Sequence, residues 1–463
     1  MLEKYKKPDV VYKFTEANCE ILYHEVLCDV LYFYKDIYPN IFIRKYDLLD
    51  EITPGICRKI KEDEIENLLF SGLLIAKRNF CIYAYDLAKP PSRSVSDSII
   101  EPESAFSSRD GFVESFKINL ALIRTRIKDP KLDIVQMSVG RRSKTIVSLL
   151  YIEDIHNLKI KKEIEKIINS IDLDAVTSLS DITSYFQRGS LFPSYQYIGS
   201  PDVAAKRLLD GEFILVIDRI SYVIGIPSTL WMATNMPIEN MNISIFTFLE
   251  KLIVVIAVFL STFFLGLICA FTTIQSDSLS LQQLSILKVT QRGIIVPVFF
   301  EILIVLSLFE LFYLIGFRQT KATISSTIVL IAGLIISENL INSGFASVFI
   351  ITMTAICFLM TFIVSVNSTT IVSISIIRLF VLLSSFYFGL YGVFLSSIFI
   401  VYLVYKEKPL GVHFFYPFIP FDYHGIIKFF TSPSSLRFKT RHVEYKIKNI
   451  YKRGKKWKNF YYL

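Results

Sequence analysis

Residues 252–274 read LIVVIAVFLSTFFLGLICAFTTI, a stretch of 23 residues without one charged side chain. A helix of about 20 apolar residues is long enough to cross a hydrocarbon core of roughly 30 Å, so this stretch predicts a membrane-spanning helix. It is the first long apolar run in the chain, and the polar opening MLEKYKK does not have the pattern of a signal peptide. We therefore expect an integral membrane protein that inserts through an internal segment.

Four more apolar segments follow this first one, at residues 294–317, 324–342, 345–366 and 379–404. We expect 345–366 and 379–404 to cross the membrane as uninterrupted spans. The last part of the chain, 406–463, holds thirteen Lys and Arg against three Asp and Glu, and flanks of this kind stay in the cytoplasm. If the N-terminal half is cytoplasmic too, the number of full crossings is even. We therefore expect four crossings and a re-entrant segment at 324–344.

Polar residues mark two of these segments as candidates for function. Glu301 and Glu310 lie about 180° apart on an ideal helix and so do not share one face. They either reach water or other helices, or they line or gate a channel, because carboxylates at membrane depth face a cavity or the bundle interior. The segment 324–342 carries the polar residues Ser325, Ser326, Ser337, Glu338, Asn339 and Asn342, which makes it a poor lipid-facing helix. Such a segment persists at membrane depth only when it is buried in protein or lines water.

The N-terminal half has the alternating pattern of a soluble α/β region. Helical spacing of apolar residues is seen at 111–127 and 157–171, and buried strands are predicted at 145–152 and 213–217. A Pro-containing linker after about residue 89 separates two subdomains. The predicted fold is an α/β cytosolic region of two subdomains followed by a multipass α-helical membrane domain. The expected boundaries are 1–92, 93–248, 249–405 and, for a basic amphipathic tail, 406–463.

No catalytic or metal-binding pattern stands out in the sequence. The chain has no HExxH, GxSxG or GxGxxG motif, and its six cysteines and five histidines show no metal-ligand spacing. The loop Gly140–Thr145 has Ser143 where a phosphate-binding loop needs glycine, so it is interpreted as a basic turn. Asp172 and Asp174 are interpreted as part of a capped turn. We expect neither an enzyme nor a cofactor or metal, and reduced cysteines fit a cytosolic N-terminal half.

Short pieces in a fixed order carry a resemblance to a known family. In the soluble half they are Arg109-Asp-Gly111, Arg124-Thr-Arg126, Gly140…Ser143-Lys-Thr145, Ile171-Asp172-Leu-Asp174 and Pro201-Asp202. In the membrane half they are Arg292-Gly293…Pro297…Glu301, Phe309-Glu310-Leu311 and Leu410-Gly411…Tyr416-Pro417…Pro420. Together they resemble the A-subunit family of spore germinant receptors, the GerA family, from about residue 93 to 421. The segment Ile336-Ser-Glu338-Asn-Leu-Ile341 departs from the family's small-residue pattern, and such departures bear on nutrient specificity and partner identity more than on fold.

The resemblance implies a role in waking dormant spores. Members of the family are expected in the inner spore membrane beside a transporter-like B subunit and a lipoprotein C subunit, where they oligomerise in a ring and release ions when a nutrient binds. On this basis the candidate pore-lining residues are Glu338, Asn339, Ile341 and Asn342, with Ile341 as a hydrophobic constriction. Glu301 and Glu310 are candidates for coupling or lining. For all six, the alternative is helix packing inside the bundle.

Other interpretations of the whole chain remain open at this point. One is an accessory family member that amplifies ion or dipicolinic-acid release without sensing nutrients, and another is a membrane scaffold that conducts nothing. The basic tail is expected to rest on anionic lipid head groups, where each basic residue contributes about 1 kcal/mol. We expect no nucleic-acid partner.

Overall fold

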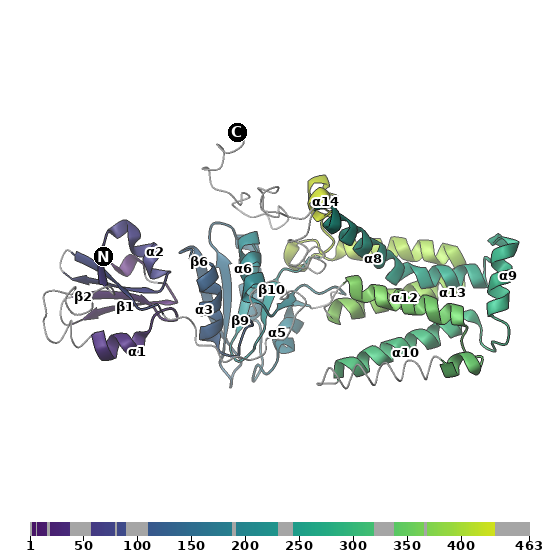
Figure 1. The fold of residues 1–463 in the computed structure, drawn as a ribbon, viewed down its shortest axis with the longest axis horizontal. Coiled ribbons are helices and arrows are strands. Elements are labelled where there is room, and N and C mark those ends of the chain that lie inside the picture. The colour runs from purple at the N-terminus through teal and green to yellow at the C-terminus, as the bar shows by residue number, and fades with distance from the viewer. Residues whose placement is uncertain are drawn as a thin grey trace.

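The computed structural model describes residues 2–5, 7–15, 19–37, 57–78, 81–88, 110–187, 191–229, 244–318, 338–364 and 368–430. Within these residues the chain forms a first sheet, a second sheet and a bundle of helices, which follow one another along the long axis (Figure 1). The predicted fold class, an α/β region followed by membrane helices, is confirmed.

The first sheet is antiparallel, with strand order β1-β2-β4-β5-β3. Its strands are β1 (Val10–Thr15), β2 (Cys19–His24), β3 (Cys57–Ile60), β4 (Leu73–Arg78) and β5 (Cys81–Asp86), with short helices α1 (Val30–Tyr32) and α2 (Ile65–Leu69). Neighbouring residues Ile21 and Leu22 on β2 belong to two different hydrophobic clusters, and both are fully buried. Because successive side chains of a strand point to opposite faces, both faces of this sheet are covered.

The second sheet is also antiparallel, with strand order β6-β7-β9-β10-β8. Its strands are β6 (Leu132–Val139), β7 (Thr145–Ile152), β8 (Gln196–Ile198), β9 (Phe213–Ile217) and β10 (Val223–Ile226). Its helices are α3 (Phe116–Arg126), α4 (Leu158–Asn169), α5 (Leu179–Phe186) and α6 (Pro201–Asp210). The strands β7 and β9 have the bounds that the apolar runs predict.

Local sequence explains these helices. On α4 the residues Ile160, Ile164 and Ile168 recur every four positions and are buried, while Asn157 caps the first turn by accepting from the backbone N–H of Lys159. All five residues of β9 are buried, which places this strand at the centre of the largest hydrophobic cluster in the described residues.

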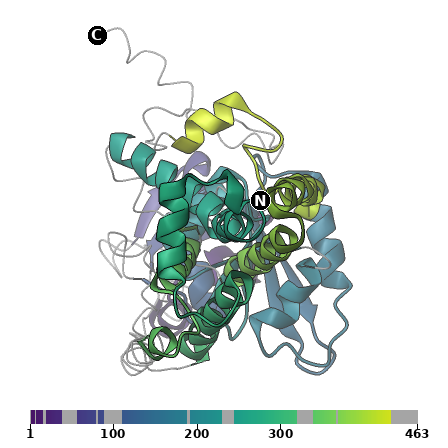
Figure 2. The ribbon, with the colours of Figure 1, turned by 90° about the vertical axis from the view of Figure 1, so that its right-hand side faces the viewer.

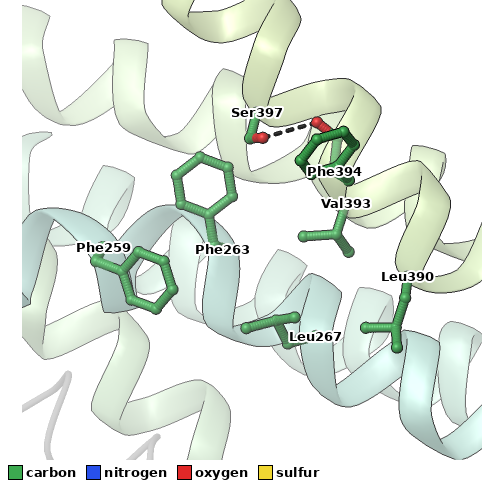
Figure 3. Close-up of a pocket in the computed structure, with 7 residues that line it drawn as sticks. All are labelled: Phe259, Phe263, Leu267, Leu390, Val393, Phe394 and Ser397. Atoms are coloured by element: carbon green, nitrogen blue, oxygen red, sulfur yellow. Dashed lines mark hydrogen bonds between the residues drawn. The ribbon is translucent and has the colours of Figure 1, made fainter.

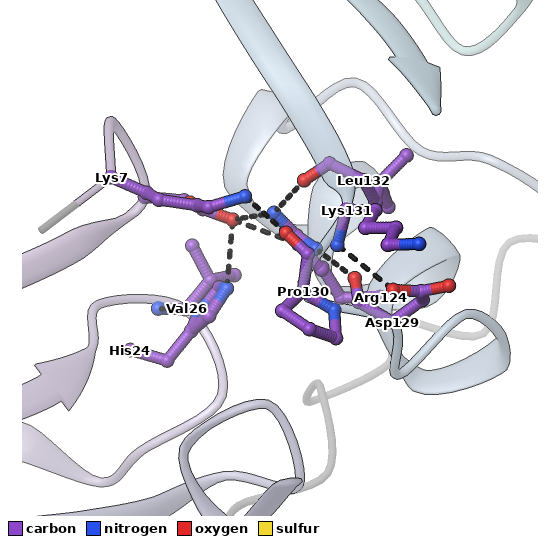
Figure 4. Close-up of polar contacts among 9 residues, drawn as sticks. Lys7, His24, Val26, Arg124, Asp129, Pro130, Lys131 and Leu132 are labelled. Carbon is purple, nitrogen blue, oxygen red and sulfur yellow. Dashed lines mark hydrogen bonds and ion pairs between the residues drawn. The ribbon is translucent and has the colours of Figure 1, made fainter. Parts of the chain in front are cut away.

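A buried ion pair joins the two sheets (Figure 4). The Arg124 guanidinium on α3 donates from Nε to the Asp9 carboxylate at 2.8 Å, and Asp9 also lies 2.9 Å from Nε2 of His24. Arg124 donates further to the carbonyls of Asp129 and Leu132, and its side chain is fully buried. This single guanidinium therefore fixes the start of the first sheet against the first helix of the second unit.

The membrane region contains α8 (Ser244–Thr273), α9 (Leu281–Thr290), α10 (Val298–Arg318), α12 (Val348–Val364) and α13 (Ser368–Lys406), followed by the short α14 (Tyr423–Phe430). Within the described residues, α8, α10 and α13 are long and apolar enough to cross a membrane, and α12 is a shorter apolar helix. Figure 2 shows the bundle viewed from the end opposite to the sheets, and the helix α9 lies across that end.

The helix α13 reverses direction at Gly389, whose φ of 62° and ψ of −140° are not helical. Across this point, Ser384 Oγ donates to the carbonyl of Gly392 at 2.9 Å, and the Phe380 and Phe399 ring centres lie 5.4 Å apart. In a continuous helix residues 380 and 399 would be about 28 Å apart. The helix is therefore a hairpin of two antiparallel arms, which we call the first arm (368–388) and the second arm (390–406).

This hairpin differs from the single span that the sequence predicts at 379–404. Glycines are common in membrane helices, so nothing in the apolar run itself marks a reversal. The Gln275 side chain holds the turn, because its Oε1 accepts from the backbone N–H of Leu390 at 3.0 Å. A Cβ at Gly389 would lie 2.4 Å from the same oxygen.

The helices α10 and α12 run in the same direction. Glu301 contacts Ser347 just before α12 begins, and the Tyr313 and Phe362 rings, toward the other ends of the two helices, lie 5.8 Å apart. The second sheet lies at the end of the bundle where α12 ends, which we call the near end. The helix α9 lies at the opposite, far end (Figure 1). Gly389 lies at this end too, next to Gln275 just after α8, and Gly344 does so through its hydrogen bond with Ile295, between α9 and α10. Residues 324–337 of the expected re-entrant segment 324–344 lie outside the described part of the chain.

Residues 407–430, here called the collar, join the second sheet to the near end of the bundle. The Phe414 ring stacks on Phe192 with centres 5.1 Å apart, and Phe429 is buried in the core of the second sheet. The Lys251 ammonium of α8 lies 5.4 Å from the centre of the Phe429 ring. Glu407 accepts from the backbone N–H of Leu191 at 3.2 Å. The soluble half and the collar thus share one end of the bundle.

Replacing Gly389 with Ala tests the hairpin. The new Cβ meets the Gln275 amide, and the positive φ is unfavourable for alanine, so we expect a loss of about 1–3 kcal/mol in unfolding free energy. The measurement is thermal unfolding of the full chain in detergent. The double variant Gly389→Ala, Gln275→Ala removes the steric conflict and recovers part of the loss, whereas Leu395→Ala on the exposed face of the second arm has little effect. Equal stability of Gly389→Ala and wild type would contradict the hairpin.

Replacing Asp9 with Asn tests the ion pair between the sheets. Burial raises the pKa of Asp9, but the hydrogen bond with His24 and the charge of Arg124 lower it more, to about 2 from 3.8. The charged form therefore stabilises the protein above pH 4, by about 2 kcal/mol for this pKa shift, and the contribution is lost as the pH falls from 3.8 to about 2. The Asn variant leaves Arg124 buried without a counter-charge, which costs about 3–5 kcal/mol at neutral pH.

Hydrogen exchange of the amides in β1 and α3 measures this effect. The gap between wild type and Asp9→Asn should narrow between pH 4 and pH 2. Glu25→Gln is the matched control, because Glu25 pairs with Lys117 across the same boundary at an exposed position and contributes less than about 1 kcal/mol. Equal protection in Asp9→Asn and Glu25→Gln would rule out the buried pair as the link.

Candidate functional site

The two glutamates of α10 contact different neighbours. Glu301 is fully buried, and its Oε1 accepts hydrogen bonds from the backbone N–H and the hydroxyl of Ser347. Its other oxygen, Oε2, is buried without a hydrogen-bond partner. Glu301 therefore fixes the start of α12 at the far end of the bundle.

Glu310 belongs to a charged network that ties three helices together. Arg378 on the first arm of α13 donates from Nη2 to Glu310 Oε1 at 2.7 Å and from Nη1 to Thr361 Oγ1 of α12 at 3.1 Å. Ser375 donates to the same Glu310 oxygen. The Arg378 side chain is 1% exposed and that of Glu310 is 30% exposed. A charge at membrane depth is costly unless it is paired, so this network holds α10, α12 and α13 in one arrangement.

Sequence reasoning missed Arg378, although a signal was present. It is the only charged residue between Glu338 and Lys406. Its partner on α10 is 68 positions earlier in the chain, and a single sequence does not show which helices become neighbours.

The four candidate pore residues lie together at the far end. Residues 338–342 form a short helical turn, and Glu338, Asn339, Ile341 and Asn342 are all exposed. The turn is anchored through Gly344, whose carbonyl accepts from the backbone N–H of Ile295 at 3.0 Å. The structure brings Glu301 close to this turn through Ser347, whereas Glu310 lies nine residues further along α10.

Several of the short sequence pieces that carry the family resemblance contact one another or close a loop in the soluble half. Arg126 contacts both Asp202, at the start of α6, and Asp110, at 3.3 Å for the latter. Arg141 forms a bidentate ion pair with Asp172, from Nε to Oδ1 at 2.8 Å and from Nη2 to Oδ2 at 2.7 Å. The backbone N–H groups of Arg142 and Ser143 donate to the carbonyl of Asp174, so the loop that begins at Gly140 is closed by its own chain rather than by a phosphate. Among the described residues no group of three His, Cys, Asp or Glu is placed to hold a metal ion.

Comparison with known proteins explains why these pieces occur in this order. A family model described as "Bacillus/Clostridium GerA spore germination protein" matches residues 46–443. The chain belongs to the GerA family. Spore germination protein XA of Bacillus anthracis is 32% identical over 77% of this chain and 73% of its own length. Stage V sporulation protein AF of Bacillus subtilis is 28% identical over 88% of this chain and 84% of its own.

One solved structure with similarity to this GerA-family chain is the N-terminal domain of the A subunit of the Bacillus megaterium spore germinant receptor GerK3. It is 24% identical and covers 49% of this chain and 91% of its own, with a TM-score of 0.34.

The charged network predicts an asymmetry between two variants. Glu310→Gln leaves the buried Arg378 without a counter-charge, whereas Arg378→Gln leaves a carboxylate that is partly exposed. For Glu310→Gln we expect the free energy of unfolding to fall by about 2–3 kcal/mol, which is less than the about 3–5 kcal/mol expected when a fully buried pair is broken. For Arg378→Gln we expect a smaller fall. Thermal unfolding of the full chain in detergent measures both.

The double variant Glu310→Gln, Arg378→Gln is the control for this pair. It replaces both charges with amides of similar shape, so it should be more stable than Glu310→Gln alone. Additive losses in the double variant would show that the two side chains do not act on each other.

Proposed function

We propose that this GerA-family chain is a membrane subunit of a spore germinant receptor that forms an oligomeric, nutrient-gated channel for ion release. Membership of the family supports the germination role. The channel role rests on the exposed polar turn 338–342 at the far end of the bundle.

The exposure of the turn 338–342 is the observation that carries the proposal. In a ring of identical subunits, the residues that line the central path are exposed when one subunit is viewed alone. Glu338, Asn339, Ile341 and Asn342 meet this requirement, and their mixture of a carboxylate, amides and one apolar side chain suits a cation path with a hydrophobic constriction. The six candidates therefore fall into two groups. The four residues of the turn are exposed, whereas Glu301 and Glu310 accept hydrogen bonds from Ser347 and Arg378 of the same subunit.

Glu301 and Glu310 are proposed to couple the bundle to this turn. Glu301 holds Ser347, only five residues after Asn342, so any shift of α10 moves the base of the turn. Glu310 holds the first arm of α13. Near its start, Ser373 of this arm donates a hydrogen bond to the carbonyl of Leu191, which lies in the connection between α5 and β8 of the soluble half. A movement of the soluble half can thus reach the turn through packed helices and two charged contacts.

The proposed setting follows the family. The soluble half and the basic tail lie in the cytosol, the bundle lies in the inner spore membrane, and the tail rests on anionic lipid. A transporter-like B subunit and a lipoprotein C subunit complete the receptor, and B supplies the nutrient signal.

A second candidate function is an accessory role in which the chain amplifies ion or dipicolinic-acid release without sensing nutrients. What favours it is that one relative, Stage V sporulation protein AF, which matches 88% of this chain, carries the name of a sporulation protein and not of a germination protein. Deleting the gene separates the two. Loss of the response to one nutrient class supports the receptor subunit, and slower germination with every germinant supports the accessory role.

The turn itself is tested by Ile341→Ala and Glu338→Gln. Removing the constriction should raise the resting ion leak, and removing the charge should lower cation conductance. Planar-bilayer recordings of the purified oligomer measure both. Ile376→Ala is the control, because Ile376 is an exposed apolar residue on the first arm, away from the turn. Conductance equal to wild type in both variants would show that the turn does not line the ion path. If neither the wild type nor any variant conducts ions, the chain is a membrane scaffold and not a channel.

A further inference from the structure

The bundle has an apolar groove between α8 and the second arm of α13 (Figure 3). Its one lining hydroxyl, on Ser397, donates to the carbonyl of Phe394 at 2.7 Å, and the other lining side chains are hydrocarbons. The groove therefore holds no titratable group, and nothing in the described structure shows what covers it.

A carboxyl group with different surroundings is buried in the second sheet. Glu212 lies between α6 and β9, and its side chain is 1% exposed. The Arg207 guanidinium of α6 faces it, with Nη1 3.7 Å from Glu212 Oε2. This distance is longer than the about 2.7–3.2 Å of an N–H···O hydrogen bond. Within the described residues, neither of these two buried atoms has a hydrogen-bond partner.

The two side chains meet at the backbone of β10. A Cβ added to Gly225 would lie 3.3 Å from Arg207 Nη1 and 3.4 Å from Glu212 Oε2. The same Cβ would lie 2.9 Å from Cδ1 of Ile198 on β8. Gly225 is itself paired with β9 on one side and β8 on the other. Any rearrangement of the two charged side chains therefore presses on the centre of a three-stranded part of the sheet.

The charged groups that face Glu212 come from α6. The strands β7, β8, β9 and β10 contain no Asp, Glu, Lys, Arg or His. On α6, Arg207 is an opposite charge, Asp210 is a buried like charge, and Lys206 is exposed. The charged residues of the neighbouring α3 pair elsewhere, Lys117 with Glu25, Arg124 with Asp9, and Arg126 with Asp110 and Asp202.

These surroundings favour the neutral form of Glu212. A carboxylate that is removed from water needs hydrogen bonds as well as a counter-charge, and Oε2 has no hydrogen bond in the described residues. Burial raises the pKa of Glu212 from 4.5 to about 8, against the opposing charge of Arg207 and with the like charge of Asp210. Glu212 is therefore protonated at pH 7.

We propose that Glu212 is a proton-binding site and that release of its proton loosens the packing of α6 on β10. The ionised carboxylate needs Arg207 to move closer or water to enter, and both changes act on Gly225. The strand β10 is the last one before the membrane helices, and the chain continues from it toward α8. A rise in pH thus weakens the strand that leads into the bundle.

The direction of the pH effect follows from the two forms of the carboxyl group. When this part of the sheet opens, Glu212 meets water and its pKa returns to 4.5, whereas in the packed form it is about 8. The proton therefore stabilises the packed form fully below pH 4.5, and this contribution is lost as the pH rises to about 8. Within this range the opening equilibrium constant rises by up to about tenfold per pH unit and then levels off.

Hydrogen exchange of the β10 amides in the purified full chain measures this equilibrium. Protection, corrected for the intrinsic exchange rate, should fall by up to about tenfold per pH unit between pH 6 and pH 8 in the wild type. Glu212→Gln has the shape of the protonated acid and does not ionise, so its β10 protection should stay constant. Glu163→Gln removes an exposed carboxylate of α4 and should behave as the wild type does.

Infrared spectroscopy detects the proton directly. The carbonyl band of protonated carboxyl groups should be larger in the wild type than in Glu212→Gln at pH 6, by one group per chain, and this difference should disappear as the pH rises through about 8. In Arg207→Gln the band should persist to higher pH, because the opposing charge is gone.

Three results would overturn the proposal. They are the same pH dependence of β10 protection in Glu212→Gln and wild type, no difference between their carboxyl bands at pH 6, and an equal fall in protection in β2 of the first sheet. Failure of Glu212→Gln to fold at pH 6 would count against it too, because the amide replaces a group that is neutral at that pH. Ion conductance plays no part in these readouts, so the result is independent of the proposed channel.

Discussion

The pairing of Arg378 with Glu310 is the constraint on which the helical bundle depends. A guanidinium buried at membrane depth has no water to solvate it, so the helices must bring it a counter-charge and further hydrogen-bond acceptors. Glu310 comes from α10, Thr361 from α12 and Ser375 from the same helix as the arginine. Apolar packing alone would allow helices to slide or rotate against each other. The network selects one register among them.

The soluble half uses the same device at its own boundary. Arg124 is as deeply buried as Arg378, and Asp9 meets it from a sheet that begins more than a hundred residues earlier. Arg126, two positions further on α3, faces Asp202 and Asp110 instead. One helix thus carries two arginines that hold different parts of the chain, which explains why the piece Arg124-Thr-Arg126 belongs to the ordered series seen in the sequence.

Sequence patterns predicted the elements whose formation depends on local periodicity. The runs TIVSLLYI and FILVI became β7 and β9 with the expected bounds, and the first apolar run became most of α8. What the sequence did not show depends on contacts between distant segments. The reversal at Gly389 needs Gln275, more than a hundred positions earlier, and Arg378 needs Glu310. The glutamates of α10 illustrate the same limit, because helical geometry predicted their opposite faces but not the neighbours that each would meet.

The reversal at Gly389 also determines which surfaces the bundle presents at its far end. The hairpin turns at one residue, and the Gln275 side chain packs against that turn. It therefore has no extended loop there for a protease to bind and cleave. In the described chain the exposed residues at that end belong to α9, to the segments on either side of it, to the turn 338–342 and to the side chains beside Gly389, such as Tyr391. Any reagent or binding protein that approaches from that side would therefore meet short exposed segments instead of a long loop, and one of these segments is the proposed lining of the ion path.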